Sequence, residues 1–128
     1  MVMYKISIVS YLNSTPFIYG MKKNSIFSSI DLSLDFPSEC AEKLLKDKID
    51  IGLVPVVVVP KLREANILSD YCIGSEGKVD TVCIFSDVPI EEVESISLDY
   101  QSLTSVKLLK VLLREYFFVN PVMNVAEK

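Results

Sequence analysis

The sequence predicts an α/β fold in two parts, and three observations indicate this class. Apolar segments with strand-like patterns occur at residues 3–9, 31–36 and 50–54. Helical patterns separate these segments, so strand, helix and strand follow one another within about 25 residues, as in a parallel βαβ unit. Near residues 74–78 the chain begins a second strand and helix series, which predicts a first lobe at 1–76 and the start of a second at 77–128.

Two helices are expected in the first lobe. The first covers residues 17–23, and Pro16 lies near its first turn, where a missing N–H costs nothing. The second begins around Ser38 and ends near Lys48. Ser38 is a favourable N-cap residue, and Glu39 lies near the positive end of the helix dipole.

The rest of the first lobe is shaped by two prolines. Pro55 ends the strand at 50–54, and Pro60 allows only one short helical turn before it. Irregular chain follows, and residues 67–75 are expected to be extended.

Two strands and one long helix are expected in the second lobe. Residues 78–86 are apolar on both faces, which favours a strand covered on both sides. Residues 95–99 form another short strand, and Ser102 precedes the strongest helical pattern, at 103–118. Its buried stripe is expected to contain Val106, Leu109, Leu112, Leu113, Tyr116 and Phe117.

Composition excludes several classes of protein. The net charge of −4 gives no bulk attraction to nucleic acid. No window approaches the roughly 18 consecutive apolar residues of a membrane span. The first residues enter a strand directly, without the features of a signal peptide. We therefore expect a cytoplasmic protein that binds neither nucleic acid nor membrane.

The cysteines and missing motifs argue against a metal or organic cofactor. Cys40, Cys72 and Cys83 form no Cys-x-x-Cys pair, and the sequence has no histidine, so no zinc site is expected. We interpret all three as buried free thiols in a reducing compartment. Glycine-rich nucleotide loops and the Gly-x-Ser-x-Gly motif are also missing, which argues against nucleotide cofactors and serine hydrolases.

Three polar clusters follow predicted strands, where open α/β sheets bind their ligands. The first contains Ser10, Asn13, Ser14 and Thr15, and the second runs from Ser75 to Thr81. The third places hydroxyl side chains at a helix N-terminus, which favours an anion; these are Ser102, Thr104 and Ser105. The structural alternatives are an ordinary loop, a plain turn and an N-cap with solvated first-turn residues.

Four sequence blocks together resemble the MqnA family, chorismate dehydratase of the futalosine route to menaquinone. They occur in the family's order and extend over nearly the whole chain: Ser10-Tyr-Leu-Asn-Ser-Thr-Pro-Phe17, Asp50-Ile-Gly-Leu-Val-Pro55, Cys72-Ile-Gly-Ser75 with Gly77-Lys-Val79, and Leu98-Asp99 with Ser102-Leu-Thr-Ser105.

The resemblance implies the two-lobed fold of type II periplasmic binding proteins and an enzyme without metal or organic cofactor. It implies that Asn13 is the central active-site residue, with Ser10 and Ser14 beside it. Ser102, Thr104 and Ser105 would hold a substrate carboxylate. Thr81 stands where the family usually has Ser, and it keeps the hydroxyl.

Family members are about twice this length, so the resemblance implies an incomplete second lobe. We expect this 128-residue form to be inactive and to form homo-oligomers through surfaces left open by truncation. The alternative function is a non-catalytic solute-binding module for a small carboxylate, because both functions use the same polar strand ends.

Overall fold

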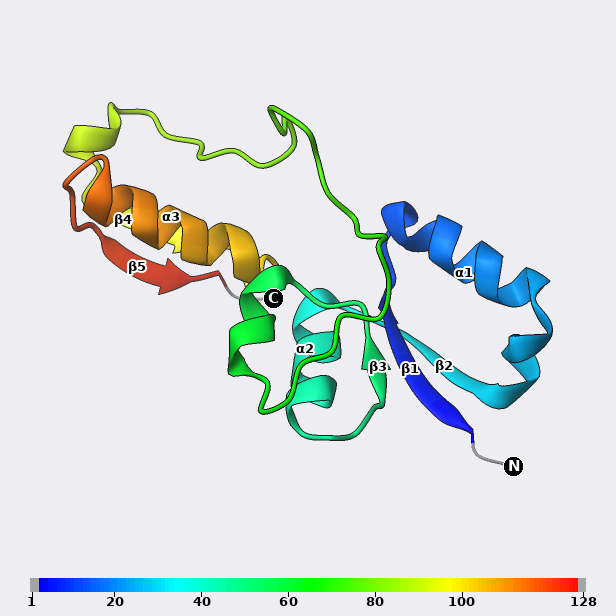
Figure 1. Ribbon diagram of the computed structural model, residues 1–128. Helices are drawn as coiled ribbons and strands as arrows, with labels where there is room; N and C mark the ends of the chain where they lie inside the picture. The colour runs from blue at the N-terminus through cyan, green and yellow to red at the C-terminus, as the bar shows by residue number, and fades with distance from the viewer. Residues whose placement is uncertain (1–2, 127–128) are drawn as a thin grey trace. The chain divides into compact units, whose positions relative to one another are not determined.

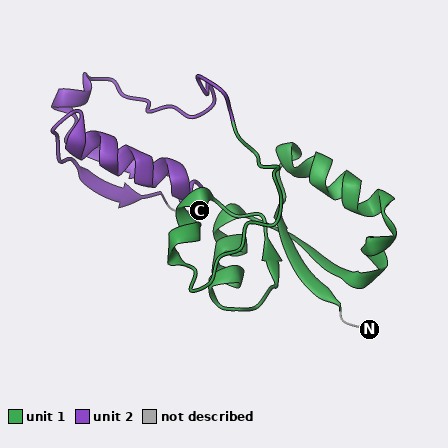
Figure 2. Ribbon diagram, in the orientation of Figure 1, with its two compact units in different colours: residues 1–74 green, residues 75–128 purple. Residues whose placement is uncertain are grey.

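Every strand pair in the computed structural model, which describes residues 3–126, is parallel. The chain divides into two compact units, residues 1–74 and 75–128 (Figure 2). The predicted mixed α/β class with parallel strands is confirmed.

Unit 1 contains a three-stranded sheet of order β2-β1-β3, with β1 between its two neighbours (Figure 1). The three segments predicted to be strands therefore share one sheet. Its elements are β1 (Tyr4–Val9), 3₁₀ helix η1 (Leu12–Ser14), α1 (Thr15–Lys23), 3₁₀ helix η2 (Ser25–Ser29), β2 (Ile30–Asp35), α2 (Pro37–Leu45), β3 (Ile51–Gly52) and 3₁₀ helix η3 (Val56–Lys61).

α2 packs against β1 and β3 on the sheet face of Ser7, whose Oγ bonds to Cys40 Sγ, whereas Ile6 and Ile8 lie on the opposite face of β1. α1 buries none of its residues. The buried apolar side chains come from β1, α2 and η3, and they are Ile6, Ile8, Val9, Cys40, Ala41 and Val58.

The described part of unit 2 contains fewer helices and strands than that of unit 1, and it buries fewer apolar side chains. β4 pairs with β5, and α3 connects them along the chain. Among residues 75–126, the buried hydrophobic side chains are Leu98 and Leu113. Its elements are 3₁₀ helix η4 (Ile90–Glu92), β4 (Ser95–Leu98), α3 (Leu103–Glu115) and β5 (Val122–Val125).

The strand predicted at residues 78–86 is wrong, because this segment is irregular. Its apolar side chains are exposed, and Phe85 is 93% exposed. Strand propensity alone does not make a strand, since the backbone groups need a neighbouring ladder. The segment 67–75, predicted to be extended, likewise forms no ladder.

The free thiols are buried at only one of three positions. Cys40 is buried, whereas Cys72 and Cys83 are exposed. The prediction for these two was wrong because both lie in the irregular segment between η3 and η4, which forms no layer over them.

The helix ends differ from the prediction in four places, and the first is α1, which begins at Thr15 rather than at residue 17. Phe36, not Ser38, occupies the N-cap of α2, and its N–H donates to the Glu39 carboxylate at 3.1 Å. α2 ends at Leu45, three residues early. α3 ends at Glu115, so Tyr116 lies beyond the last turn and is 71% exposed rather than buried.

None of the helices described over residues 3–126 has the length and apolar character needed to cross a membrane.

Candidate functional site

The first polar cluster lies at the carboxyl end of β1, where the chain passes through η1 into α1. The backbone N–H of Ser10 donates to the Asp35 carbonyl oxygen at 2.9 Å, which extends the β1–β2 ladder by one bond. Ser10 and Asn13 are exposed, and Asn13 lies in η1. Their side chains are therefore accessible from the end of the sheet, as the sequence predicted for a ligand-binding edge.

Ser14 differs from its neighbours because it is fully buried. Its N–H donates to the Tyr11 carbonyl oxygen at 3.0 Å, and the residue occupies the N-cap of α1. The side chain makes no capping bond, and Ser14 Oγ is a buried polar atom without a hydrogen-bond partner. A buried hydroxyl without a partner loses its hydration and gains no replacement, which costs about 1–3 kcal/mol.

The third predicted cluster lies between β4 and α3 and is already satisfied internally. Asp99 accepts a bond from the Gln101 backbone N–H at 2.9 Å and one from Ser102 Oγ at 2.6 Å. These two bonds, that from Ser102 above all, lower the pKa of Asp99. Ser102 occupies the N-cap of α3 but makes no capping bond with its side chain.

Thr104 and Ser105 lie in the first turn of α3 and are half-buried. First-turn N–H groups have no partner within a helix, so this turn can donate to an anion. Thr81 is exposed in a turn of the irregular segment of unit 2. The structure thus groups Ser10, Asn13 and Ser14 in unit 1 and Ser102, Thr104 and Ser105 in unit 2.

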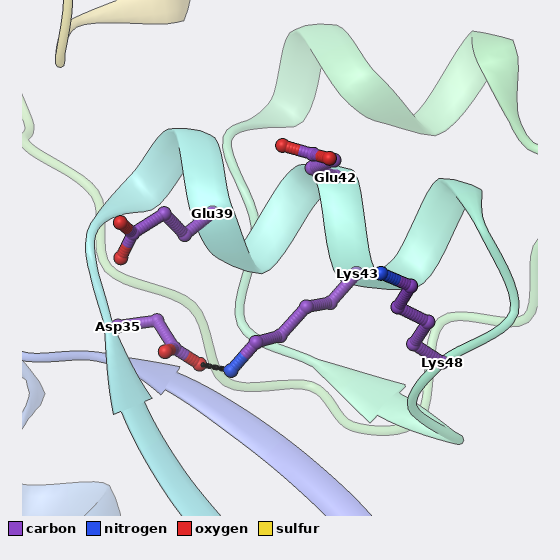
Figure 3. A pocket seen from close by; sticks show the side chains of 5 residues that line it. All are labelled: Asp35, Glu39, Glu42, Lys43 and Lys48. Atoms are coloured by element: carbon purple, nitrogen blue, oxygen red, sulfur yellow. Dashed lines mark hydrogen bonds and ion pairs between the residues drawn. The ribbon is translucent and has the colours of Figure 1, made fainter.

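A further polar cluster, around Asp35, was not predicted from the sequence. Asp35 ends β2, and its Oδ2 accepts three bonds from three elements: Ser7 Oγ of β1 at 2.6 Å, Ser33 Oγ of β2 at 2.7 Å and Lys43 Nζ of α2 at 2.6 Å. Figure 3 shows Lys43 reaching from α2 to Asp35. An open hollow of about 300 Å³ lies here, lined by Asp35, Glu39, Glu42, Lys43 and Lys48.

The electrostatics of this cluster keep Asp35 ionised. Burial alone would raise the pKa of Asp35, but the hydrogen bonds from Lys43, Ser7 and Ser33 outweigh it and lower that pKa. Cys40 Sγ lies 2.9 Å from Ser7 Oγ. Burial raises the pKa of the Cys40 thiol, so this cysteine is held in its protonated, unreactive form.

The sequence contains a pattern that could have predicted this cluster. Ser33 and Asp35 share one face of β2 because side chains alternate along a strand. Ser7 is the one serine inside the apolar run of β1, and it is directly opposite Ser33 in the parallel register. Two serines opposite each other on adjacent strands, with a carboxylate at the end of one strand on the same face, indicate a polar cluster on that face of the sheet.

Across residues 3–126, no three His, Cys, Asp or Glu side chains are grouped so that they could hold a metal ion.

Comparison with known protein families identifies a family that the chain matches. The family model described as menaquinone biosynthesis matches residues 4–127, nearly the whole chain, and this range includes all three predicted polar clusters. The resemblance stated on four sequence blocks is confirmed at this level, and the chain belongs to the menaquinone biosynthesis family.

Proposed function

We propose that this protein is a cytoplasmic chorismate dehydratase, a lyase of the futalosine route that forms 3-(1-carboxyvinyloxy)benzoate. The observation that carries the proposal is the family match over residues 4–127, which assigns the chain to menaquinone biosynthesis. Within that family, the four sequence blocks resemble the MqnA branch. The neutral hydroxyl and amide groups beyond β1 support a site that works without a charged acid–base pair.

The proposal includes the two-lobed architecture of type II periplasmic binding proteins. The parallel order β2-β1-β3 and the separate parallel pair β4-β5 support it. In such a fold ligands bind beyond the carboxyl ends of the parallel strands. Unit 1 would then supply the groups that face the reacting ring, and unit 2 would supply an anion site.

In unit 1, Asn13 is proposed to orient the reacting ring and to donate a hydrogen bond to the leaving hydroxyl. Asn13 is exposed beyond β1, where a bound molecule can reach it. Ser14 supports this assignment, because a buried Oγ without a partner can gain a bond when a ligand or a small loop movement supplies one. Ser10 is proposed to contact the substrate from the same loop.

In unit 2, the proposal divides the hydroxyl groups by role. Ser102 gives its hydrogen to Asp99, so it acts on a carboxylate ligand only indirectly, by holding the turn before α3. Thr104, Ser105 and the first-turn N–H groups are the donors proposed to hold a substrate carboxylate. Thr81 is proposed to add a further hydroxyl contact.

The chemistry needs little from the protein. Chorismate loses the hydroxyl of its ring and the hydrogen on the neighbouring ether-bearing carbon, and the products are one water molecule and an aromatic ring. Aromaticity drives the step, so orientation and a hydrogen bond to the leaving group supply the catalysis, with a substrate carboxylate as the proposed base. Both carboxylates of the dianion would be held by neutral donors.

The test is incubation of the protein, expressed from its whole gene, with chorismate. Proton NMR follows the ring signals, and mass spectrometry follows the loss of one water. Catalytic appearance of the aromatic product supports the proposal. Saturable binding of chorismate without product would instead identify a solute-binding module, and neither binding nor product would reject both functions.

A further inference from the structure

The Asp35 cluster lies at the carboxyl end of β2, which pairs with β1, and the proposed chemistry does not use it. Its carboxylate lies at the end of β2 with a side chain only 14% exposed, and Ser7 beside it is fully buried. Three donors from β1, β2 and α2 converge on one carboxylate oxygen, Asp35 Oδ2. The cluster thus joins three elements at a single atom.

Stability alone gives no strong reason for such a cluster. Burying an ion pair removes hydration, and well-packed apolar side chains at the same place are often equally or more stabilising. Unit 1 is a small unit with an otherwise apolar core in β1 and α2. What an ion pair supplies, and apolar side chains do not, is a defined geometry between the groups that it joins.

That geometry continues directly into the loop that contains Asn13. The backbone carbonyl of Asp35 accepts the N–H of Ser10 at 2.9 Å, the last bond of the β1–β2 ladder before the loop. The side chain of Asp35 is held by Lys43, which also lies 3.2 Å from Ser33 Oγ. The residue that anchors the start of the loop is therefore itself fixed by α2.

We propose that Asp35 and Lys43 are positioning residues whose ion pair fixes the carboxyl ends of β1 and β2 and thereby holds the loop of residues 10–14 in its binding geometry. The role of that loop in catalysis rests on the proposed function. The control of the loop by the ion pair does not.

The first experiment measures amide hydrogen exchange by NMR in the whole protein. In Lys43→Met, we expect exchange at the Ser10 amide to accelerate at least about tenfold more than exchange at the amides inside β1, because the ladder end opens locally. Lys43→Arg keeps the cation and should restore most of the protection. Lys46→Met is the matched control, because Lys46 directly follows α2 and its exposed side chain forms an ion pair with exposed Glu42.

Equal acceleration at Ser10 and inside β1 would overturn the proposal, since the ion pair would then act only on global stability. Unchanged exchange at Ser10 would overturn it as well. If Lys43→Met does not fold, Ser33→Ala removes one of the three bonds to Asp35 and takes its place. The same differential acceleration at Ser10, smaller in size, is then expected.

The second experiment separates this inference from the proposed function. With chorismate, Lys43→Met should lower kcat at least about tenfold, Lys43→Arg should recover most of it, and Lys46→Met should match the wild type. If the wild type does not convert chorismate, the proposed function fails, and the exchange data alone decide the positioning role. If the wild type converts chorismate and Lys43→Met does so equally fast, the positioning role fails.

Discussion

Polar clusters were predicted at two strand-to-helix junctions, and the two junctions differ in how far their side chains hydrogen-bond to one another. At the β4–α3 junction, Asp99 accepts bonds from Ser102 and from the Gln101 backbone, so the turn is satisfied from within. At the β1–α1 junction, Ser14 Oγ is buried without a partner and Asn13 is exposed. The serine at the N-cap of α3 is thus hydrogen-bonded within its own turn, whereas the serine at the N-cap of α1 is not. The β1–α1 junction retains hydrogen-bonding capacity for a ligand, and the β4–α3 junction uses part of its own internally.

The cores of the two units differ as well. In the described part of unit 1, six apolar side chains from β1, α2 and η3 are buried, whereas in that of unit 2 the buried hydrophobic side chains are Leu98 and Leu113. Several apolar residues of α3 and its flanks are exposed, among them Leu108 at 55%, Val111 at 50% and Phe118 at 82%. Unit 2 therefore has a small core and exposes several apolar side chains of α3 and its flanks.

The largest expected effect concerns the thin core of unit 2. Leu113→Ala should destabilise unit 2 by about 3 kcal/mol, because the side chain is 1% exposed and leaves a cavity. Lys107→Ala, at an exposed position of the same helix, is the matched control and should change stability by less than about 0.5 kcal/mol. Urea unfolding followed by NMR signals of β4 and β5 measures both. Equal effects would show that α3 is not packed as described.

Self-association is the next largest effect. We expect the exposed apolar side of α3 to be buried against a second copy, so Leu108→Lys with Val111→Lys should weaken the dimer at least about tenfold, which corresponds to 1.4 kcal/mol. Lys107→Gln on the same helix serves as the control. Sedimentation velocity at micromolar concentrations measures the change. A wild-type protein that stays monomeric over this range would contradict the expectation.

Two serine substitutions sharpen the comparison of the junctions, because they should have opposite signs. Ser102→Ala removes the bond to Asp99 and should cost about 1 kcal/mol of unfolding free energy. Ser14→Ala removes a buried hydroxyl without a partner, so it should be neutral or stabilising by up to about 1 kcal/mol in the unliganded protein. Urea unfolding gives both values. Clear destabilisation by Ser14→Ala would mean that its hydroxyl is satisfied in the free protein.

The smallest effect is the response to acid at the β4–α3 junction. The pKa of Asp99 is lowered in the folded protein by Ser102 and by the Gln101 backbone. Its contribution is therefore fully present above the unfolded pKa of about 3.9 and is lost as pH falls through the lower folded value. Asp99→Asn should flatten the loss of unit 2 stability below about pH 4. Parallel acid profiles for Asp99→Asn and wild type would contradict this.

The sequence predicted structure correctly where the segments that pack together are also close in the chain. The parallel sheet of unit 1 was predictable because strand, helix and strand follow one another and force a crossover. The strand expected at 78–86 was not found. Its apolar pattern predicts burial on two faces, but it does not show which strands would pair with it. For the same reason, exposed Cys83 was expected to be buried.

The candidate site shows a similar division. The position of Asn13 beyond β1 followed from the strand pattern and the polar residues after it. The Asp35 cluster did not, since it depends on which residues of β1, β2 and α2 face one another. The hydrogen bond from Ser102 to Asp99 was also missed, because spacing alone does not reveal whether a serine caps a helix or bonds to an acid nearby.

The most direct measurement of the central claim is the chorismate assay on Asn13→Ala beside Asn66→Ala. Both variants remove an exposed amide side chain from unit 1, but Asn66 lies in the irregular segment after η3. We expect Asn13→Ala to lower the rate of aromatic product formation about 100-fold or more, as loss of one well-placed donor does elsewhere. Asn66→Ala should convert chorismate at the wild-type rate. Equal rates for the two variants would remove Asn13, and the β1–α1 junction with it, from the reaction.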